Sequence, residues 1–194
     1  MVRERGIAMN MIDLLETSPV IAAVKNESGL ENCLKTDCRV VFLLFGTICD
    51  VAELVDRVKE SGKIAIVHVD LIQGLSSKEV AVDFIRRNTR ADGIISTKSP
   101  IVKHAKELGM ICIQRTFVVD SMALSTLKKQ IESFHPDAIE IMPGVMPRVI
   151  QKIRQETELP LIAGGLLSDK KDIMAAFEAG ADAVSTTREE LWYV

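Results

Sequence analysis

Aromatic side chains are scarce in this sequence of 194 residues, of which Phe, Trp and Tyr together make up 4%. Proteins that bind single-stranded nucleic acid commonly stack bases on aromatic rings. Trp192 and Tyr193 are the only Trp and Tyr, so there is little material for a stacking platform. An excess of one charge is also missing, because 24 Lys and Arg stand against 27 Asp and Glu. The net charge of −3 argues against a surface coated in phosphate-binding cations, so binding to nucleic acid would need a local basic patch.

Long apolar runs are absent as well. The longest cover residues 40–46 and 64–69, far short of the ~20 residues that a membrane span requires. Residues 1–6 lack the apolar stretch of a secretory signal, and the four cysteines form no C-x-x-C pair. We therefore expect a cytoplasmic protein with no membrane association, no metal site and no cofactor.

Short apolar runs rich in β-branched residues alternate with charged segments of helical periodicity, and this alternation occurs eight times. The runs are 20–24, 40–45, 64–69, 93–96, 111–114, 138–142, 161–163 and 183–185. Their near-continuous apolarity indicates burial on both faces, as in a parallel sheet covered by helices. Eight such units predict an α/β fold of the small (β/α)8 TIM-barrel type, with an open doubly wound sheet as the alternative. No linker interrupts the pattern, so we expect a single domain at 12–194 after an N-terminal extension at 1–11.

Polar residues at the strand ends form the first candidate site. Alternation of side chains along the strands, together with position at the C-terminal rim, selects Lys25, His68, Asp70, Lys98 and Glu140, with Gln114 or Arg115 from the fifth strand. A buried charge needs a partner or a polar ligand, so we expect these groups to meet each other or a ligand. The alternatives are a ring of structural ion pairs and, for His68, a satisfied core histidine.

Small and hydroxylated residues after the last two strands form the second candidate site. Gly164 and Gly165 follow the seventh predicted strand, and Ser185, Thr186 and Thr187 end the eighth. In many barrels the loops after these strands bind phosphate through backbone N–H groups. The pattern predicts a phosphate site, while a tight turn explains the glycine pair equally well. A phosphate opposite carboxylates fits a small polyol phosphate, because carboxylates accept hydrogen bonds from hydroxyls.

Six segments in order carry a resemblance to a known family. They are HVDLIQG at 68–74, DGIISTKS at 92–99, QR at 114–115, DAIEIMPG at 137–144, AGG at 163–165 and REELW at 188–192. Together they resemble the bacterial glycerol-3-phosphate-responsive antiterminator family, the glycerol uptake operon antiterminator regulatory proteins, over residues 19–192. The resemblance implies a cytoplasmic barrel that senses glycerol 3-phosphate and acts on the leader mRNA of glycerol-catabolism transcripts, so that the polymerase passes a terminator.

Two basic clusters are candidates for an RNA contact. They are Arg86, Arg87 and Arg90, and Arg148, Lys152 and Arg154. Each cluster is also explained as a solvated helix face. The oligomeric state stays open, a homo-oligomer included.

A small barrel enzyme acting on a phosphorylated polyol or sugar is the alternative function. An aldolase needs a desolvated lysine, for which Lys98 or Lys25 would serve. An isomerase or epimerase needs a base, for which Glu140 or Asp70 would serve. The resemblance favours a regulator that binds its ligand without converting it.

Overall fold

The structure, a computed structural model, describes residues 11–193, and this part of the chain contains eight strands that alternate with helices. The strands are β1 Val20–Val24, β2 Val40–Leu43, β3 Ile64–His68, β4 Gly93–Ser96, β5 Ile111–Phe117, β6 Ala138–Met142, β7 Leu161–Gly164 and β8 Ala183–Thr186. The helices are α1 Met11–Thr17, α2 Glu27–Cys33, α3 Val51–Glu60, α4 Val80–Asn88, α5 Ser99–Glu107, α6 Ser121–Phe134, α7 Pro147–Glu156 and α8 Lys170–Glu178, with the 3-10 helices η1 Val69–Leu71 and η2 Glu189–Tyr193.

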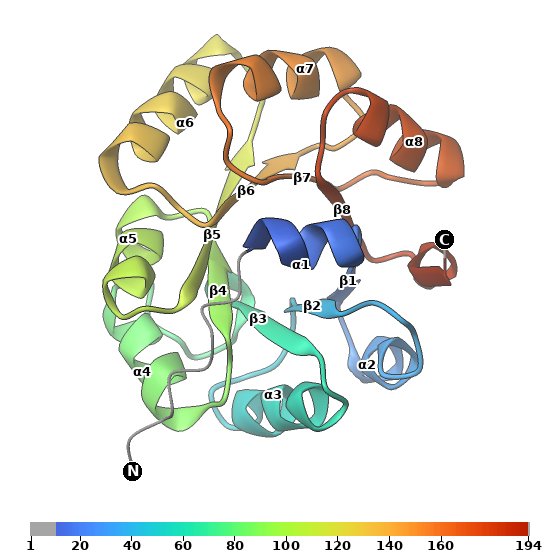
Figure 1. Cartoon of the computed structure of the whole chain (residues 1–194). Helices are drawn as coiled ribbons and strands as arrows, with labels where there is room; N and C mark the ends of the chain where they lie inside the picture. The colour runs from blue at the N-terminus through green and yellow to red at the C-terminus, as the bar shows by residue number, and fades with distance from the viewer. Residues whose placement is uncertain (1–10, 194) are drawn as a thin grey trace.

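The strands close into a barrel. Each strand pairs in parallel with the next one along the chain, and β8 pairs with β1. Figure 1 shows the helices after β1 arranged as a ring around the strands. The predicted (β/α)8 TIM barrel is thus confirmed, and the open sheet is excluded. No helix among residues 11–193 is long and apolar enough to cross a membrane.

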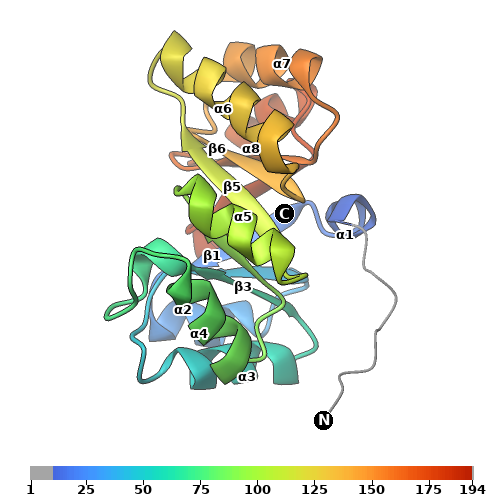
Figure 2. The ribbon, with the colours of Figure 1, turned by 90° about the vertical axis from the view of Figure 1, so that its left-hand side faces the viewer.

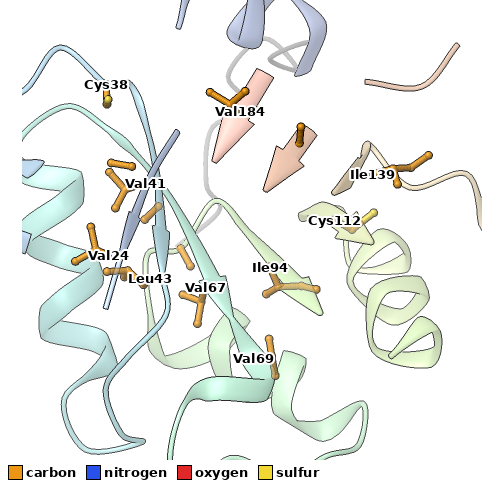
Figure 3. Packing of buried hydrophobic residues seen from close by; sticks show 14 of the residues in the cluster. Val24, Cys38, Val41, Leu43, Val67, Val69, Ile94, Cys112, Ile139 and Val184 are labelled. Carbon is orange, nitrogen blue, oxygen red and sulfur yellow. The ribbon is translucent and has the colours of Figure 1, made fainter. Parts of the chain in front are cut away.

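The barrel has two apolar layers, one inside the strands and one between the strands and the outer helices. In β3, Ile64 and Ile66 face the interior, whereas Ala65 and Val67 pack in the outer layer. Figure 3 shows members of this outer layer, Val67 among them. The predicted alternation of side chains holds, and it is what brings selected polar residues inside the barrel.

Helix α1 covers the end of the barrel where the strands begin. Met11, Leu14 and Leu15 are buried against inward-facing residues of the strands. Figures 1 and 2 show α1 lying across one open end, apart from the surrounding ring. Met11 already belongs to this helix, although the predicted domain begins one residue later. Residues 1–10 of the predicted extension lie outside the described residues.

Five strands, β2, β3, β5, β7 and β8, end one to three residues away from their predicted ends, and the differences at β5 and β3 affect the candidate site. β5 continues to Phe117 because it keeps pairing with β6 as far as Met142. Arg115 is therefore a strand residue with a fixed direction. β3 ends at His68 and turns directly into η1. Asp70 consequently leaves the inward alternation that the sequence assigned to it.

An aspartate recurs just before three of the strands. Asp92, Asp137 and Asp182 each accept a hydrogen bond from a backbone N–H of the preceding strand. Each also pairs with a basic residue in the last turn of the helix that leads into that preceding strand, namely α3, α5 or α7. Asp137, for example, accepts from the Cys112 N–H at 2.9 Å and from Lys106 Nζ at 2.5 Å. These contacts tie together a strand, its helix and the next strand at the end opposite the candidate site.

Candidate ligand-binding site

A cavity of about 330 Å³ opens at the end of the barrel where β7 and β8 finish. It is lined by Ala23, Leu44, Arg115, Met142, Gly165, Leu166, Leu167, Ser185, Thr186, Thr187 and Arg188. The β7–α8 loop and the end of β8 with the two residues after it therefore form one side, and residues of β1, β5 and β6, with Leu44 directly after β2, complete it. This volume is in the range of small-molecule sites.

A buried charge network lies at the inner end of this cavity. Arg115 Nε donates to Glu140 Oε2, and Ser185 Oγ donates to Glu140 Oε1 at 2.5 Å. Arg115 and Glu140 are register partners on β5 and β6, which points both side chains to the same face. Glu140 is 0% exposed and Arg115 is 7% exposed. Removing either partner would leave an uncompensated buried charge, so the pair is fixed in place.

Gly164 on β7 makes room for this network. A Cβ at that position would lie 2.6 Å from both Glu140 Oε1 and Ser185 Oγ. The following residues also have an unusual backbone, because Gly165 has φ +74° and Leu166 has φ +61°. Leu166 adopts a conformation that non-glycine residues seldom take, and its side chain is exposed. The loop thus holds a specific backbone shape beside the cavity.

A second polar cluster surrounds Asp70, outside the cavity lining. The Asp70 carboxylate accepts from Ser96 Oγ at 3.0 Å and from the Thr97 N–H at 2.8 Å, and Lys98 Nζ lies 3.5 Å away. Burial acts to raise the pKa of Asp70, but the bonds from Thr97 and Ser96 outweigh it and hold the pKa below its usual value. Asp70 therefore stays ionised and ties η1 to the end of β4.

His68 lies in the barrel interior between the two clusters. Its side chain is buried, and burial followed by the positive charge of Arg115 lowers its pKa to about 4. Its Nδ1 is 4.0 Å from Asp70 Oδ2 and has no hydrogen-bond partner among the described residues. His68 is therefore a neutral imidazole near pH 7.

The structure brings together part of each predicted site. Among the predicted phosphate-binding residues, the cavity is lined by Gly165, Ser185, Thr186 and Thr187, with Gly164 directly behind. Of the predicted polar end, Glu140 lies buried beneath the lining. His68, Asp70 and Lys98 lie to one side, and Lys25 is exposed after β1. The alternative of one ring of ion pairs is not what the structure contains, because the charges form separate pairs, Asp70 with Lys98 and Glu140 with Arg115.

Two arginines, Arg115 and Arg188, line the cavity. Arg115 was one of two alternatives on the fifth strand, and its register with Glu140 decides in its favour. Gln114 instead donates to the backbone carbonyls of Thr97 and Arg115. Arg188 was not singled out as a ligand residue. Its place two residues after Thr186 is the signal that identifies it.

The basic clusters fall at different places on the barrel. Arg86 and Arg87 are exposed in the last turn of α4, near the barrel end opposite the cavity, and Arg90 lies 3.6 Å from Asp56. Arg148 is exposed in the first turn of α7, on the cavity side.

The rest of the second cluster and the two C-terminal aromatics differ in their exposure. Lys152 is exposed, but Arg154 donates to the carbonyl oxygens of Thr157 and Leu159 and pairs with Asp182. Trp192 is buried and donates to the Thr186 carbonyl at 2.9 Å, which leaves Tyr193 as the exposed aromatic. Arg154 and Trp192 are therefore occupied within the barrel.

The described residues include no group of three or more His, Cys, Asp or Glu side chains placed to hold a metal ion. The cavity lining in this part of the chain contains no lysine. The lining contains two guanidinium groups, side-chain hydroxyls and backbone N–H groups. Such groups form hydrogen bonds with the phosphate and hydroxyl groups of a ligand.

The similarity to known proteins extends over nearly the whole barrel. Residues 20–192 match the family described as glycerol-3-phosphate responsive antiterminator. Over 184 residues the chain is 43% identical to the uncharacterized protein YgcP of Escherichia coli (strain K12), which covers 95% of this chain and 96% of that protein. The glycerol uptake operon antiterminator regulatory protein from Listeria monocytogenes has a similar structure, with a TM-score of 0.85, 34% identity and coverage of 89% of this chain and 94% of that one. A glycerol uptake operon antiterminator-related protein from Thermotoga maritima gives a TM-score of 0.80, 30% identity and coverage of 90% and 98%. The chain therefore belongs to the glycerol-3-phosphate responsive antiterminator family.

Proposed function

We propose that this protein is a cytoplasmic sensor of glycerol 3-phosphate, which binds in the cavity at the ends of β7 and β8. With ligand bound, the protein acts on the leader mRNA of glycerol-catabolism transcripts and prevents termination. The observation that carries the proposal is the cavity of about 330 Å³ that joins the β7–α8 loop to Arg115 and Arg188. Family membership supports the ligand, and the cavity supplies groups that suit it.

The phosphate end is assigned to the loops after β7 and β8. Gly165 has no side chain, so its backbone is open to an anion, and the hydroxyl of Thr187 is exposed nearby. Arg188 adds a guanidinium at the mouth that is about half exposed and whose contact with Glu190, at 3.3 Å, is itself exposed to solvent. A guanidinium matches a phosphate group in charge and hydrogen-bond geometry.

Binding without conversion fits the groups that surround the cavity. A Schiff base needs a lysine, and Lys98 lies beside Asp70 outside the lining. A general base must reach the substrate, and Glu140 is 0% exposed, lies outside the cavity lining and is held by Arg115 and Ser185. These arrangements favour a sensor over a barrel enzyme.

Calorimetric titration with glycerol 3-phosphate, glycerol and inorganic phosphate tests the sensor. We expect glycerol 3-phosphate to bind more tightly than inorganic phosphate and glycerol to give no measurable heat, because the charged end contributes most. Equal binding of glycerol and glycerol 3-phosphate would contradict the assigned phosphate end. Phosphorus NMR of the ligand kept overnight with protein should show one unchanged resonance. A new resonance that disappears in a Lys98→Ala variant would establish an enzyme instead.

A further inference from the structure

We propose that Arg115 and Glu140 form a charge-neutral reader, meaning a pair of side chains that binds the end of the ligand opposite the phosphate and selects an uncharged hydroxylated group over a carboxylate. Glu140 is the positioning residue and Arg115 is the group that touches the ligand. The inference rests on the proposed function, since it assumes that a phosphate monoester enters the cavity.

Arg115 lines the cavity, and only its Nε bonds to Glu140. A guanidinium has five N–H donors, and the bond to Glu140 uses the one on Nε. The side chain is 8% exposed, and Arg115 is among the residues that line the cavity. The four N–H donors on the terminal nitrogens are therefore the ones available to a ligand oxygen.

Glu140 fixes both the direction and the net charge of this reader. Its two oxygens are held by Arg115 and Ser185, and Oε1 occupies the space that a side chain at Gly164 would need. A buried carboxylate beside a buried guanidinium makes a group with no net charge. A hydroxyl can accept from Arg115 without changing that balance, whereas a carboxylate would add a negative charge close to Glu140.

The two ends of the cavity differ in how firmly their positive charge is held by a partner. At the mouth, Arg188 is half exposed and pairs with Glu190 at 3.3 Å, an exposed contact that stabilises little and leaves the guanidinium open to a phosphate. At the inner end, the positive charge of Arg115 is already balanced by Glu140. This arrangement suits a ligand with one phosphate and one neutral end, and it disfavours a ligand of the same size with an anion at each end.

The charge balance is tested with two ligands that differ in one group. Glycerol 3-phosphate and glycerate 3-phosphate, both as racemates, are titrated at pH 7.5 into the wild type and into Glu140→Gln. We expect the wild type to favour glycerol 3-phosphate by about tenfold or more. Gln retains an acceptor for Arg115 but removes the negative charge, so the Kd ratio should shift toward glycerate 3-phosphate by on the order of tenfold or more. The Kd ratio is informative because, if Glu140 had a purely structural role, its loss would lower the affinity for both ligands by the same factor.

Two control variants separate charge from packing. Glu140→Asp keeps the charge, so it should keep the wild-type selectivity even if both affinities fall. Asp56→Asn removes a carboxylate from the exposed ion pair with Arg90, away from the cavity lining, and should leave both Kd values unchanged. Circular dichroism and thermal melts establish that each variant is folded. If Glu140→Gln does not fold, the double variant Arg115→Met/Glu140→Gln removes both charges and should retain the preference for glycerol 3-phosphate with weaker binding.

The outcomes distinguish this inference from the proposed function. If the wild type binds neither phosphate ester, the ligand assignment and this inference both fail. If it binds glycerol 3-phosphate but glycerate 3-phosphate equally well, only the charge-neutral reader is wrong. An unchanged Kd ratio in folded Glu140→Gln overturns it as well.

Discussion

Gly164 on β7 lies directly against Glu140 on β6, so that a methyl group at Gly164 would come within 2.6 Å of Glu140 Oε1. The same methyl group would meet Ser185 Oγ at 2.6 Å, and these two oxygens are already hydrogen-bonded to each other. The residue without a side chain thus sets the space in which the buried carboxylate is held.

Gly164→Ala should therefore destabilise the protein by about 2–4 kcal/mol. The added methyl group would overpack the site and displace Glu140 from its buried ion pair with Arg115. Urea denaturation monitored by circular dichroism measures the change. Gly62→Ala is the control, since Gly62 has a positive φ but no atom within 4 Å of its added Cβ. It should cost about 1 kcal/mol. Equal losses in the two variants would refute the close approach to Glu140.

Gly165→Asp should abolish binding of glycerol 3-phosphate while the fold survives. The new carboxylate would stand beside the expected position of the phosphate, and its Cβ would meet only the flexible end of Met142. Gly109→Asp is a matched control, because Gly109 has a similar positive φ of +68° and open space around it. Calorimetric titration of both variants decides the matter. Wild-type affinity in Gly165→Asp would place the phosphate elsewhere.

Stability should fall as the pH drops from about 6.5 toward 4, in part because of His68. Burial and Arg115 lower its pKa from 6.5 to about 4, so the unfolded chain takes up a proton over this window while the folded protein does not. The contribution to stability is intact above pH 6.5 and is lost as the pH approaches 4, by on the order of 3 kcal/mol. Denaturation curves at several pH values measure it. His68→Gln should flatten the profile in this window, and an unchanged slope would show that His68 does not titrate as inferred.

RNA binding should depend on Arg148 more than on the arginines of α4. Arg148 is exposed on the cavity side, whereas Arg86 and Arg87 lie near the opposite end. Arg148→Ala should weaken ligand-dependent binding of a cognate leader RNA roughly threefold to tenfold and leave binding of glycerol 3-phosphate unchanged. Gel-shift titrations with and without ligand measure the effect. The triple variant Arg86→Ala, Arg87→Ala and Arg90→Ala is the comparator, and a larger loss there would move the interface to α4.

The salt dependence and the coupling of this RNA complex should both be measurable. With a net charge of −3, about four phosphate contacts would give a log–log slope of roughly −3 to −4. Any factor by which ligand tightens RNA binding must equal the factor by which RNA tightens ligand binding. Absence of ligand-dependent binding at low salt and micromolar protein would contradict the proposed RNA partner.

The barrel was predictable from sequence because its strands are short, apolar and regularly spaced. Side-chain alternation placed Glu140 inside, and loop position placed Gly165 and Thr186 beside the cavity. Asp70 was harder, because a 3-10 turn after β3 interrupts the alternation, a feature that hydrophobic periodicity does not encode. Arg115 could be named only as an alternative, since its partner depends on the register between β5 and β6. Pairing between strands far apart in the chain is the information that a local pattern lacks.

The strands are aligned by Asp92, Asp137 and Asp182 at one end of the barrel, whereas the candidate ligand site lies at the other end. Each fixes the start of one strand against its neighbour at the end remote from the cavity. A slip of one residue between β5 and β6 would turn Glu140 outward and leave Arg115 without its partner. The loops around the cavity can thus change in length or sequence while the alignment persists. An extra residue inserted between Asp137 and Glu140 would instead leave the start of β6 in place and turn the Glu140 side chain to the outer face of the barrel.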